Sequence, residues 1–193
     1  MKFNLRHLLI LLSLLLLSVG FGFAFDATAG AVERHQNPRP EGLSPSVERY
    51  AREYGVPESV IWATMCEGSE FASNARGEDG RIGLMQLTPE QFSFICTTLL
   101  GEEEIDAGML YDPETNLRAG TAYLSYLFGK YGIWEHVFAA YASAPEIVDA
   151  WLSDPEKLSP QGVLTVYPDD AVKGRAKALN KTMDQYNKLY YQS

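Results

Sequence analysis

Two glutamates in the stretch 65-MCEGSEFASN-74 have the residue type and position that acid–base chemistry needs. Glu67 and Glu70 lie on either side of Gly68, shortly before the motif 83-GLMQLTP-89. A glutamic acid can protonate a leaving oxygen when apolar surroundings keep its carboxyl protonated near neutral pH. The apolar residues before Glu67 can supply such surroundings. The question is which of the two glutamates faces a substrate.

Helices are the elements that must position these residues. Prolines at first turns and glycines just past the ends divide the chain into short helical segments, and residues 72–81 predict a loop. The clearest start is Thr88-Pro89-Glu90-Gln91, which predicts a capping box. The predicted helices cover residues 45–54, 57–67, 89–100, 113–131, 134–142 and 145–152, followed by a terminal helix with an apolar stripe from Val172 to Tyr190.

No segment alternates convincingly with the period of a β-strand, so we predict an all-α domain, or an α-dominated α+β domain. The chain of 193 residues suits one domain. It has no metal-ligand cluster and no phosphate-binding glycine loop, so we expect neither a metal nor a cofactor. His136 stands alone in its predicted helix, which favours a packed or surface histidine over a ligand or base.

The N-terminus has the features of an export signal. Lys2 and Arg6 precede an apolar run over residues 8–25, and the cleavage-like pattern Ala27-Thr28-Ala29 follows. The run is long for a signal peptide and barely long enough for a membrane span, so cleavage and anchoring both stay open. We expect an extracytoplasmic protein of the cell envelope, secreted or anchored, with membrane contact only through this segment. The predicted parts are a signal or anchor at 1–29, a linker at 30–45 and one domain at 46–193.

The net charge of −9 argues against nucleic acid as a partner and does not oppose an uncharged glycan. We expect a monomer. Cys66 and Cys96 would meet an oxidising compartment after export, and both a disulfide and an unpaired core cysteine stay open.

Four blocks of sequence resemble the lytic transglycosylase family, whose domain is goose-lysozyme-like. They match in order and spacing over roughly residues 46–152: 55-GVPESVIWATMCEGSEFASNA-75, 83-GLMQLTP-89, 112-DPETNLRAGTAYLSYL-127 and 139-AAYASAP-145. The resemblance implies a lysozyme-like helical domain with a substrate groove. Its partner would be the glycan strands of peptidoglycan, cut between N-acetylmuramic acid and N-acetylglucosamine.

The implied reaction needs one glutamic acid and no second carboxylate nucleophile, unlike that of most glycosidases. The acid protonates the glycosidic oxygen, and the resulting carboxylate then accepts the proton of the muramyl 6-hydroxyl as a 1,6-anhydro ring closes. On this resemblance we expect Glu67 to be the catalytic residue. The expected substrate-binding residues are Ser69, Met85, Gln86, Tyr123, Tyr141 and Asp169.

The register at Glu67 departs from the family pattern. Laid without gaps on Phe71 and on the neighbouring blocks, the pattern puts Gly68 where the acid belongs, with Glu67 one residue early and Glu70 two residues late. One residue is about 100° around a helix. Three alternatives follow: Glu67 acts through a local π-bulge or widened turn, Glu70 acts from the loop, or neither acts and the domain only binds glycan. We predict the first.

Two further departures affect the substrate contacts. Ala142 replaces an asparagine of the family, and Lys173 stands where the family often has a tyrosine, with only Asp169 and Asp170 in place of a glutamate. Fewer substrate contacts keep weak activity or pure glycan binding open. Hydrolysis of the same bond, as in goose-type lysozyme, is a further alternative.

Overall fold

The computed structural model describes residues 32–77, 79–102 and 106–192. The chain divides into two compact units, Met1–Pro38 and Arg39–Ser193, so the second unit begins within the predicted linker. Of the first unit, the structure describes a short helical segment at 32–36 and the residues that follow it. The predicted signal or anchor at 1–29 lies outside the described residues. Among those that are described, no helix is long and apolar enough to cross a membrane.

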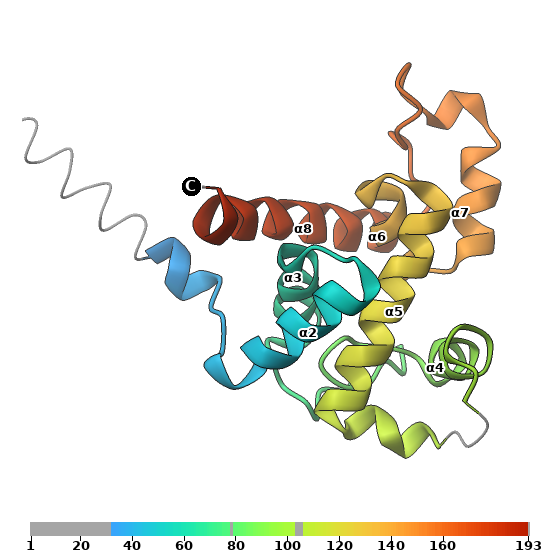
Figure 1. Cartoon of the computed structure of the whole chain (residues 1–193). Helices are drawn as coiled ribbons and strands as arrows, with labels where there is room; N and C mark the ends of the chain where they lie inside the picture. The colour runs from blue at the N-terminus through green and yellow to red at the C-terminus, as the bar shows by residue number, and fades with distance from the viewer. Residues whose placement is uncertain (1–31, 78, 103–105, 193) are drawn as a thin grey trace, which may run out of the picture. The chain divides into compact units, whose positions relative to one another are not determined.

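The second unit is helical, as predicted (Figure 1). Its α-helices are α2 (Ser44–Tyr54), α3 (Glu58–Ser69), α4 (Pro89–Phe94), α5 (Pro113–Tyr131), α6 (Trp134–Ala142), α7 (Pro145–Leu152) and α8 (Asp170–Tyr186). The 3-10 and π segments are η1 (Glu41–Leu43), η2 (Ile95–Leu100), η3 (Ala107–Tyr111), η4 (Pro155–Lys157) and η5 (Asn187–Tyr191). Within the described ranges, β pairing is limited to isolated bridges.

The helix boundaries follow the capping signals of the sequence. Thr88 and Gln91 form the predicted capping box. The backbone N–H of Gln91 donates to Oγ1 of Thr88 at 3.2 Å, and the backbone N–H of Thr88 donates to Oε1 of Gln91 at 3.0 Å. Gly132 ends α5 in the left-handed conformation. The predicted end of this helix at Glu67, before Gly68, is wrong by two residues: α3 continues to Ser69, and the left-handed residue that closes it is Glu70.

The core extends through α2, α3, α5, α6 and α8, and α8 packs against both α3 and α6 (Figure 1). α3 is buried on most sides, as its apolar sequence predicts, and Trp62 within it is fully buried. α5 packs against α2 and α6. His136 on α6 is buried, and its Nε2 accepts a hydrogen bond from the backbone N–H of Leu164 at 3.1 Å, which confirms a packed role. These contacts fix the ends of α3 and α6 beside α8.

Cys66 and Cys96 are both thiols, so the structure has no disulfide between them. Burial is the main cause that raises the pKa of Cys96 to about 12, and Glu102 adds to it through a hydrogen bond and its charge. Burial likewise raises the pKa of Cys66.

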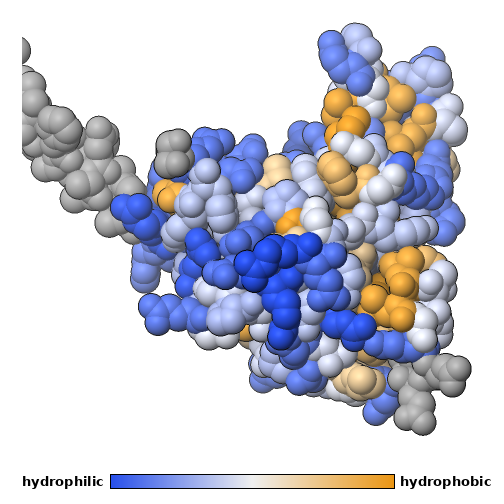
Figure 2. Space-filling model, viewed as in Figure 1, coloured by the Kyte–Doolittle hydropathy of each residue, from blue (hydrophilic) through white to orange (hydrophobic). Residues whose placement is uncertain are grey.

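Most of the surface seen in Figure 2 is hydrophilic, and hydrophobic side chains gather in two places on this face, over α4 and around α7. Large exposed apolar residues of the chain include Phe128 on α5 and Ile147 on α7. Neither of them lines the pocket at the end of α3.

Candidate active site

A pocket of about 380 Å³ lies between the end of α3, the loop before α4, the end of α6 and α8. Four of the residues predicted for the site line it, namely Glu67, Met85, Gln86 and Tyr141. The wall opposite the loop is α8, which contributes Gly174, Arg175, Ala178 and Leu179. The sequence blocks that lie far apart in the chain therefore meet at one cavity.

Glu67 faces this pocket from the last turn of α3, and its side chain is exposed to solvent. Its Oε1 accepts a hydrogen bond from the hydroxyl of Thr182 on α8 at 2.5 Å. α3 is α-helical through Ser69, so the predicted π-bulge is absent within it, but its last turn is widened, since the backbone N–H of Glu70 points at the carbonyl oxygens of both Cys66 and Met65. The irregular backbone comes afterwards, where Glu70 and Phe71 have φ values of 49° and 65°.

Gly68 lies directly against the side chain of Gln86, and both residues line the pocket. A Cβ atom at Gly68 would lie 3.1 Å from Cγ of Gln86, closer than most side chains tolerate. The position that the family pattern gives to the acid is therefore directed at Gln86, whereas Glu67 is directed at α8. Glu70 is exposed and is not among the residues that line the pocket.

Hydrogen bonds to neighbouring residues hold Met85 and Gln86 in place. The N–H of Met85 donates to Oδ1 of the fully buried Asn116 at 2.7 Å. Gln86 has a φ of 52°, and its Nε2 donates to the carbonyl oxygen of Gly83 at 2.9 Å. Among the described residues Oε1 of Gln86 takes no hydrogen bond, so it can accept one from a ligand. The missing side chain of Gly83 leaves room for the side chain of Asn116.

Tyr141 is buried, and its hydroxyl donates to the carbonyl oxygen of Met85 at 2.8 Å. Burial raises its pKa well above the usual range, so the hydroxyl stays protonated. Tyr123 lies behind it, with ring centroids 5.6 Å apart, and is outside the pocket lining. Burial raises the pKa of Tyr123 to about 12. The ring of Tyr141 therefore borders the cavity, and Tyr123 packs behind it.

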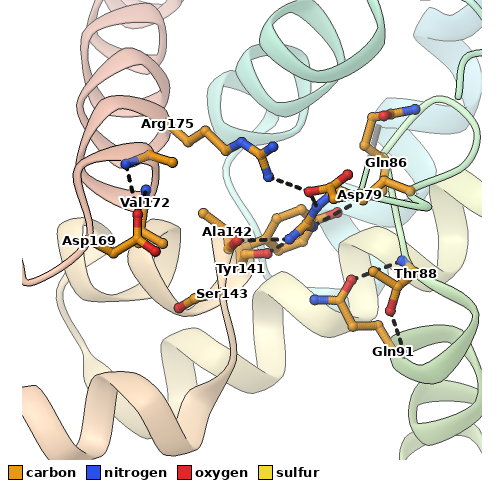
Figure 3. A network of polar contacts seen from close by, with 12 residues as sticks. Asp79, Gln86, Thr88, Gln91, Tyr141, Ala142, Ser143, Asp169, Val172 and Arg175 are labelled. Atoms are coloured by element: carbon orange, nitrogen blue, oxygen red, sulfur yellow. Dashed lines mark hydrogen bonds and ion pairs between the residues drawn. The ribbon is translucent and has the colours of Figure 1, made fainter. Parts of the chain in front are cut away.

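Ser69 and Asp169 bond to the backbone and do not line the pocket. Ser69 is buried, and its hydroxyl contacts the carbonyl oxygens of Met65 at 3.1 Å and Leu84 at 2.8 Å, which joins α3 to the loop. Asp169 caps α8 by accepting hydrogen bonds from the N–H groups of Ala171 and Val172 (Figure 3).

A charged network that we did not predict crosses the pocket (Figure 3). Arg81 is buried, and its Nε donates to Oδ2 of Asp79 at 2.9 Å. Arg175 reaches from α8 to the same oxygen, with its Nη1 at 2.7 Å. Although partial burial alone would raise the pKa of Asp79, the hydrogen bonds from Arg175 and Arg81 outweigh it and lower this pKa to about 2. The only local signal was Arg81 two residues after Asp79 in a turn-rich loop.

The sequence profile of the family described as "Transglycosylase SLT domain" matches residues 45–164, well over half of the chain. The chain belongs to this family. The SLT domain found here is similar to the membrane-bound lytic murein transglycosylases C of Yersinia pestis (strain Pestoides F) and Yersinia pseudotuberculosis serotype O:1b (strain IP 31758). Each is 36% identical over 105 residues, which cover 54% of this chain and 29% of the relative.

Solved structures show the same helical, lysozyme-like fold. An inactive mutant of the lytic transglycosylase Slt from Pseudomonas aeruginosa, with one glutamate changed to glutamine, is 28% identical with a TM-score of 0.69, covering 80% of this chain and 25% of that one. The 70 kDa soluble lytic transglycosylase of Escherichia coli is 23% identical with a TM-score of 0.75, covering 83% and 26%. The SLT domain thus corresponds to under a third of each of these longer proteins.

Proposed function

We propose that this SLT domain is a peptidoglycan lytic transglycosylase in which Glu67 is the catalytic residue. The observation that carries the proposal is the position of the Glu67 side chain, which lines one pocket with Met85, Gln86 and Tyr141 although it is one residue early in the sequence. The α-helix itself continues past Glu67 to Ser69 in this arrangement. The pocket itself extends round to the side of α3 that faces α8.

In this proposal the carboxyl of Glu67 gives its proton to the oxygen of the departing N-acetylglucosamine as the bond from that oxygen to the muramyl anomeric carbon breaks. Positive charge develops at that carbon. The 6-hydroxyl oxygen of the same muramyl sugar then bonds to the carbon, and its proton returns to Glu67. The product is a 1,6-anhydro-muramyl end, and Glu67 is protonated for the next cycle.

A bound glycan would complete the environment that a general acid needs. Glu67 is exposed in the free protein, so its carboxyl is in contact with water. A sugar that fills the pocket would displace this water and leave the carboxyl against Met85 and the apolar side of α8. Desolvation favours the protonated form of a carboxyl, so the substrate itself would help to prepare the acid.

We propose that Gln86 accepts a hydrogen bond from the sugar through Oε1, and that Met85 and Tyr141 form its apolar wall. Ser69, Tyr123 and Asp169 would act indirectly. Ser69 ties the loop to α3, Tyr123 supports the ring of Tyr141, and Asp169 begins the helix that forms the opposite wall.

The names of the relatives support a place and a partner. The similar Yersinia proteins are named membrane-bound murein transglycosylases, and a related Escherichia coli structure is a complex with bulgecin A, at 23% identity and a TM-score of 0.72. We propose that this chain acts in the cell envelope on glycan strands, reached through its N-terminal segment.

A second candidate is a glycan-binding module without catalysis, and Gly68 favours it. This glycine occupies the position of the family acid and faces Gln86, while Glu67 is bonded to Thr182. Under this alternative, a Gly68→Glu variant should gain activity that the natural chain lacks, provided that Gln86 moves by a few tenths of an ångström.

Digestion of purified sacculi followed by mass spectrometry tests the proposal. A lytic transglycosylase releases muropeptides with 1,6-anhydro ends, and this is the expected result. Muropeptides with reducing muramic acid ends would show hydrolysis, as in a goose-type lysozyme. If no muropeptides are released while sacculi still bind the protein, the chain is the non-catalytic module.

A further inference from the structure

We propose that Thr182 on α8 is a positioning residue for Glu67. It holds the Glu67 carboxyl at the pocket, although the family pattern places the acid at position 68. The inference rests on the proposed function, because it assigns Thr182 a role in the chemistry of Glu67. It adds to the site a residue from the terminal helix, outside the part of the chain that the family profile covers.

The contact between the two residues is short and bridges distant parts of the chain. Oγ1 of Thr182 lies 2.5 Å from Oε1 of Glu67, across 115 residues of sequence. Thr182 is 4% exposed, whereas Glu67 is exposed. The hydroxyl is therefore fixed by the packing of α8 against α3, and the flexible glutamate is the partner that gains order.

The direction of the Thr182 hydroxyl is a second, independent observation. A threonine inside a helix commonly donates its hydroxyl to the carbonyl oxygen four residues back. The other buried helical threonines do so: Thr64 donates to Val60 and Thr121 donates to Leu117, each at 2.8 Å. Among the described residues, Thr182 donates to Glu67 alone. Thr182 therefore bonds to Glu67 on α3 and not to a carbonyl oxygen of its own helix.

This contact compensates for the difference of one residue between Glu67 and position 68, where the family pattern places the acid. Position 68 is directed at Gln86, and position 67 is turned by about 100° from it. Without a partner, the exposed Glu67 side chain would sample several rotamers in solvent. The hydroxyl on α8 selects the one that borders the pocket. The bond from Arg175 to Asp79 joins α8 to the loop on the other side of the same cavity.

The contact also distinguishes the two oxygens of the carboxyl. Thr182 donates to Oε1, so the proton of the neutral carboxyl belongs on Oε2. Oε2 is then the atom that gives a proton to the leaving oxygen and later takes one from the 6-hydroxyl. The same hydroxyl stabilises the carboxylate between these two steps.

Steady-state turnover of soluble glycan strands by full-length Thr182→Val, Thr182→Ser and Thr121→Val variants tests the inference. We expect kcat of Thr182→Val to fall about 10- to 100-fold with little change in KM, because a misplaced catalytic group slows the chemical step and leaves binding intact. Thr182→Ser keeps the hydroxyl and should stay within a few-fold of wild type. Thr121→Val is the matched control, since it removes a buried helical hydroxyl away from the pocket.

Thermal unfolding of each variant separates a loss of position from a loss of structure. If Thr182→Val is no slower than Thr121→Val, or if Thr182→Ser is as slow as Thr182→Val, the positioning role is wrong. In that case Glu67→Gln would still be inactive, and the proposed function would stand. If wild type and Glu67→Gln have equal turnover, the proposed function fails and the inference fails with it.

Discussion

The guanidinium of Arg81 donates from Nη1 to the carbonyl oxygen of Tyr141 at 3.1 Å, which ties the pocket loop to the end of α6. The same nitrogen lies 3.2 Å from the carbonyl oxygen of Gln86, and Nη2 donates to that of Ala142 at 2.8 Å. Arg81 is buried, so it satisfies carbonyl groups that water reaches poorly. Ala142, which lacks the amide of the family's asparagine, thus serves through its backbone.

Replacing Arg81 with methionine should lower the free energy of unfolding by about 2 to 4 kcal/mol, because buried carbonyl groups lose their donor. Glycan binding should also weaken, since the loop that carries Gln86 is no longer fixed to α6. Urea unfolding and sacculus binding measure the two effects. Arg175→Met is the control: it removes an exposed partner of Asp79 and should cost about 0 to 1 kcal/mol. Equal losses of unfolding free energy in both variants would contradict this account.

The stability of the chain should depend on pH through Asp79. Its pKa is lowered to about 2 in the folded chain, against about 3.9 for an unfolded aspartate. A lowered folded pKa contributes stability above the unfolded value, and this contribution is lost as the pH falls from about 4 to about 2. Unfolding of wild type and Asp79→Asn should therefore differ most above pH 4. A difference that is unchanged at the acid end would show that Asp79 does not titrate as described.

Two glycines of α5 should respond in opposite ways to alanine. A Cβ at Gly120 would lie 2.6 Å from both Cβ and Cγ of Met85, so Gly120→Ala should destabilise the fold by about 1 to 3 kcal/mol and displace Met85 in the pocket. Gly129 has open space around it, and Gly129→Ala should stabilise by about 0.5 to 1 kcal/mol. Thermal unfolding compares them. The close approach at Gly120 is wrong if both variants are stabilised.

The two thiols should react slowly in the folded protein. Burial raises the pKa of Cys66 and Cys96, the latter to about 12, so little thiolate is present near pH 8. Labelling with a thiol reagent should be slow in buffer and rapid in denaturant, and a reducing agent should leave the melting temperature unchanged. A melting temperature that falls on reduction would indicate a disulfide instead.

The helices could be predicted because their ends carry local signals. The capping box at Thr88 and the glycines at positions 55, 101 and 132 act within a few residues of the helix that they bound. Gly68 does not end α3, because a glycine inside a helix is tolerated when tertiary packing supports it. There Gly68 packs against Gln86, and Glu70 takes the left-handed position.

The site was predicted in part. Glu67, Met85, Gln86 and Tyr141 share a pocket because the sequence blocks that contain them are brought together by the helices. The contacts of Thr182 with Glu67 and of Arg175 with Asp79 join residues 115 and 96 positions apart. No spacing rule reaches that far, since such pairs depend on how α8 packs in three dimensions.

Muropeptide release from sacculi by Glu67→Gln and Glu70→Gln tests the central claim most directly. Glu70 is a matched control because it is the nearest glutamate, is exposed and lies outside the pocket lining. We predict that Glu67→Gln loses release of anhydro-muropeptides while sacculus binding persists, and that Glu70→Gln releases them like wild type. Wild-type release by Glu67→Gln would contradict the account.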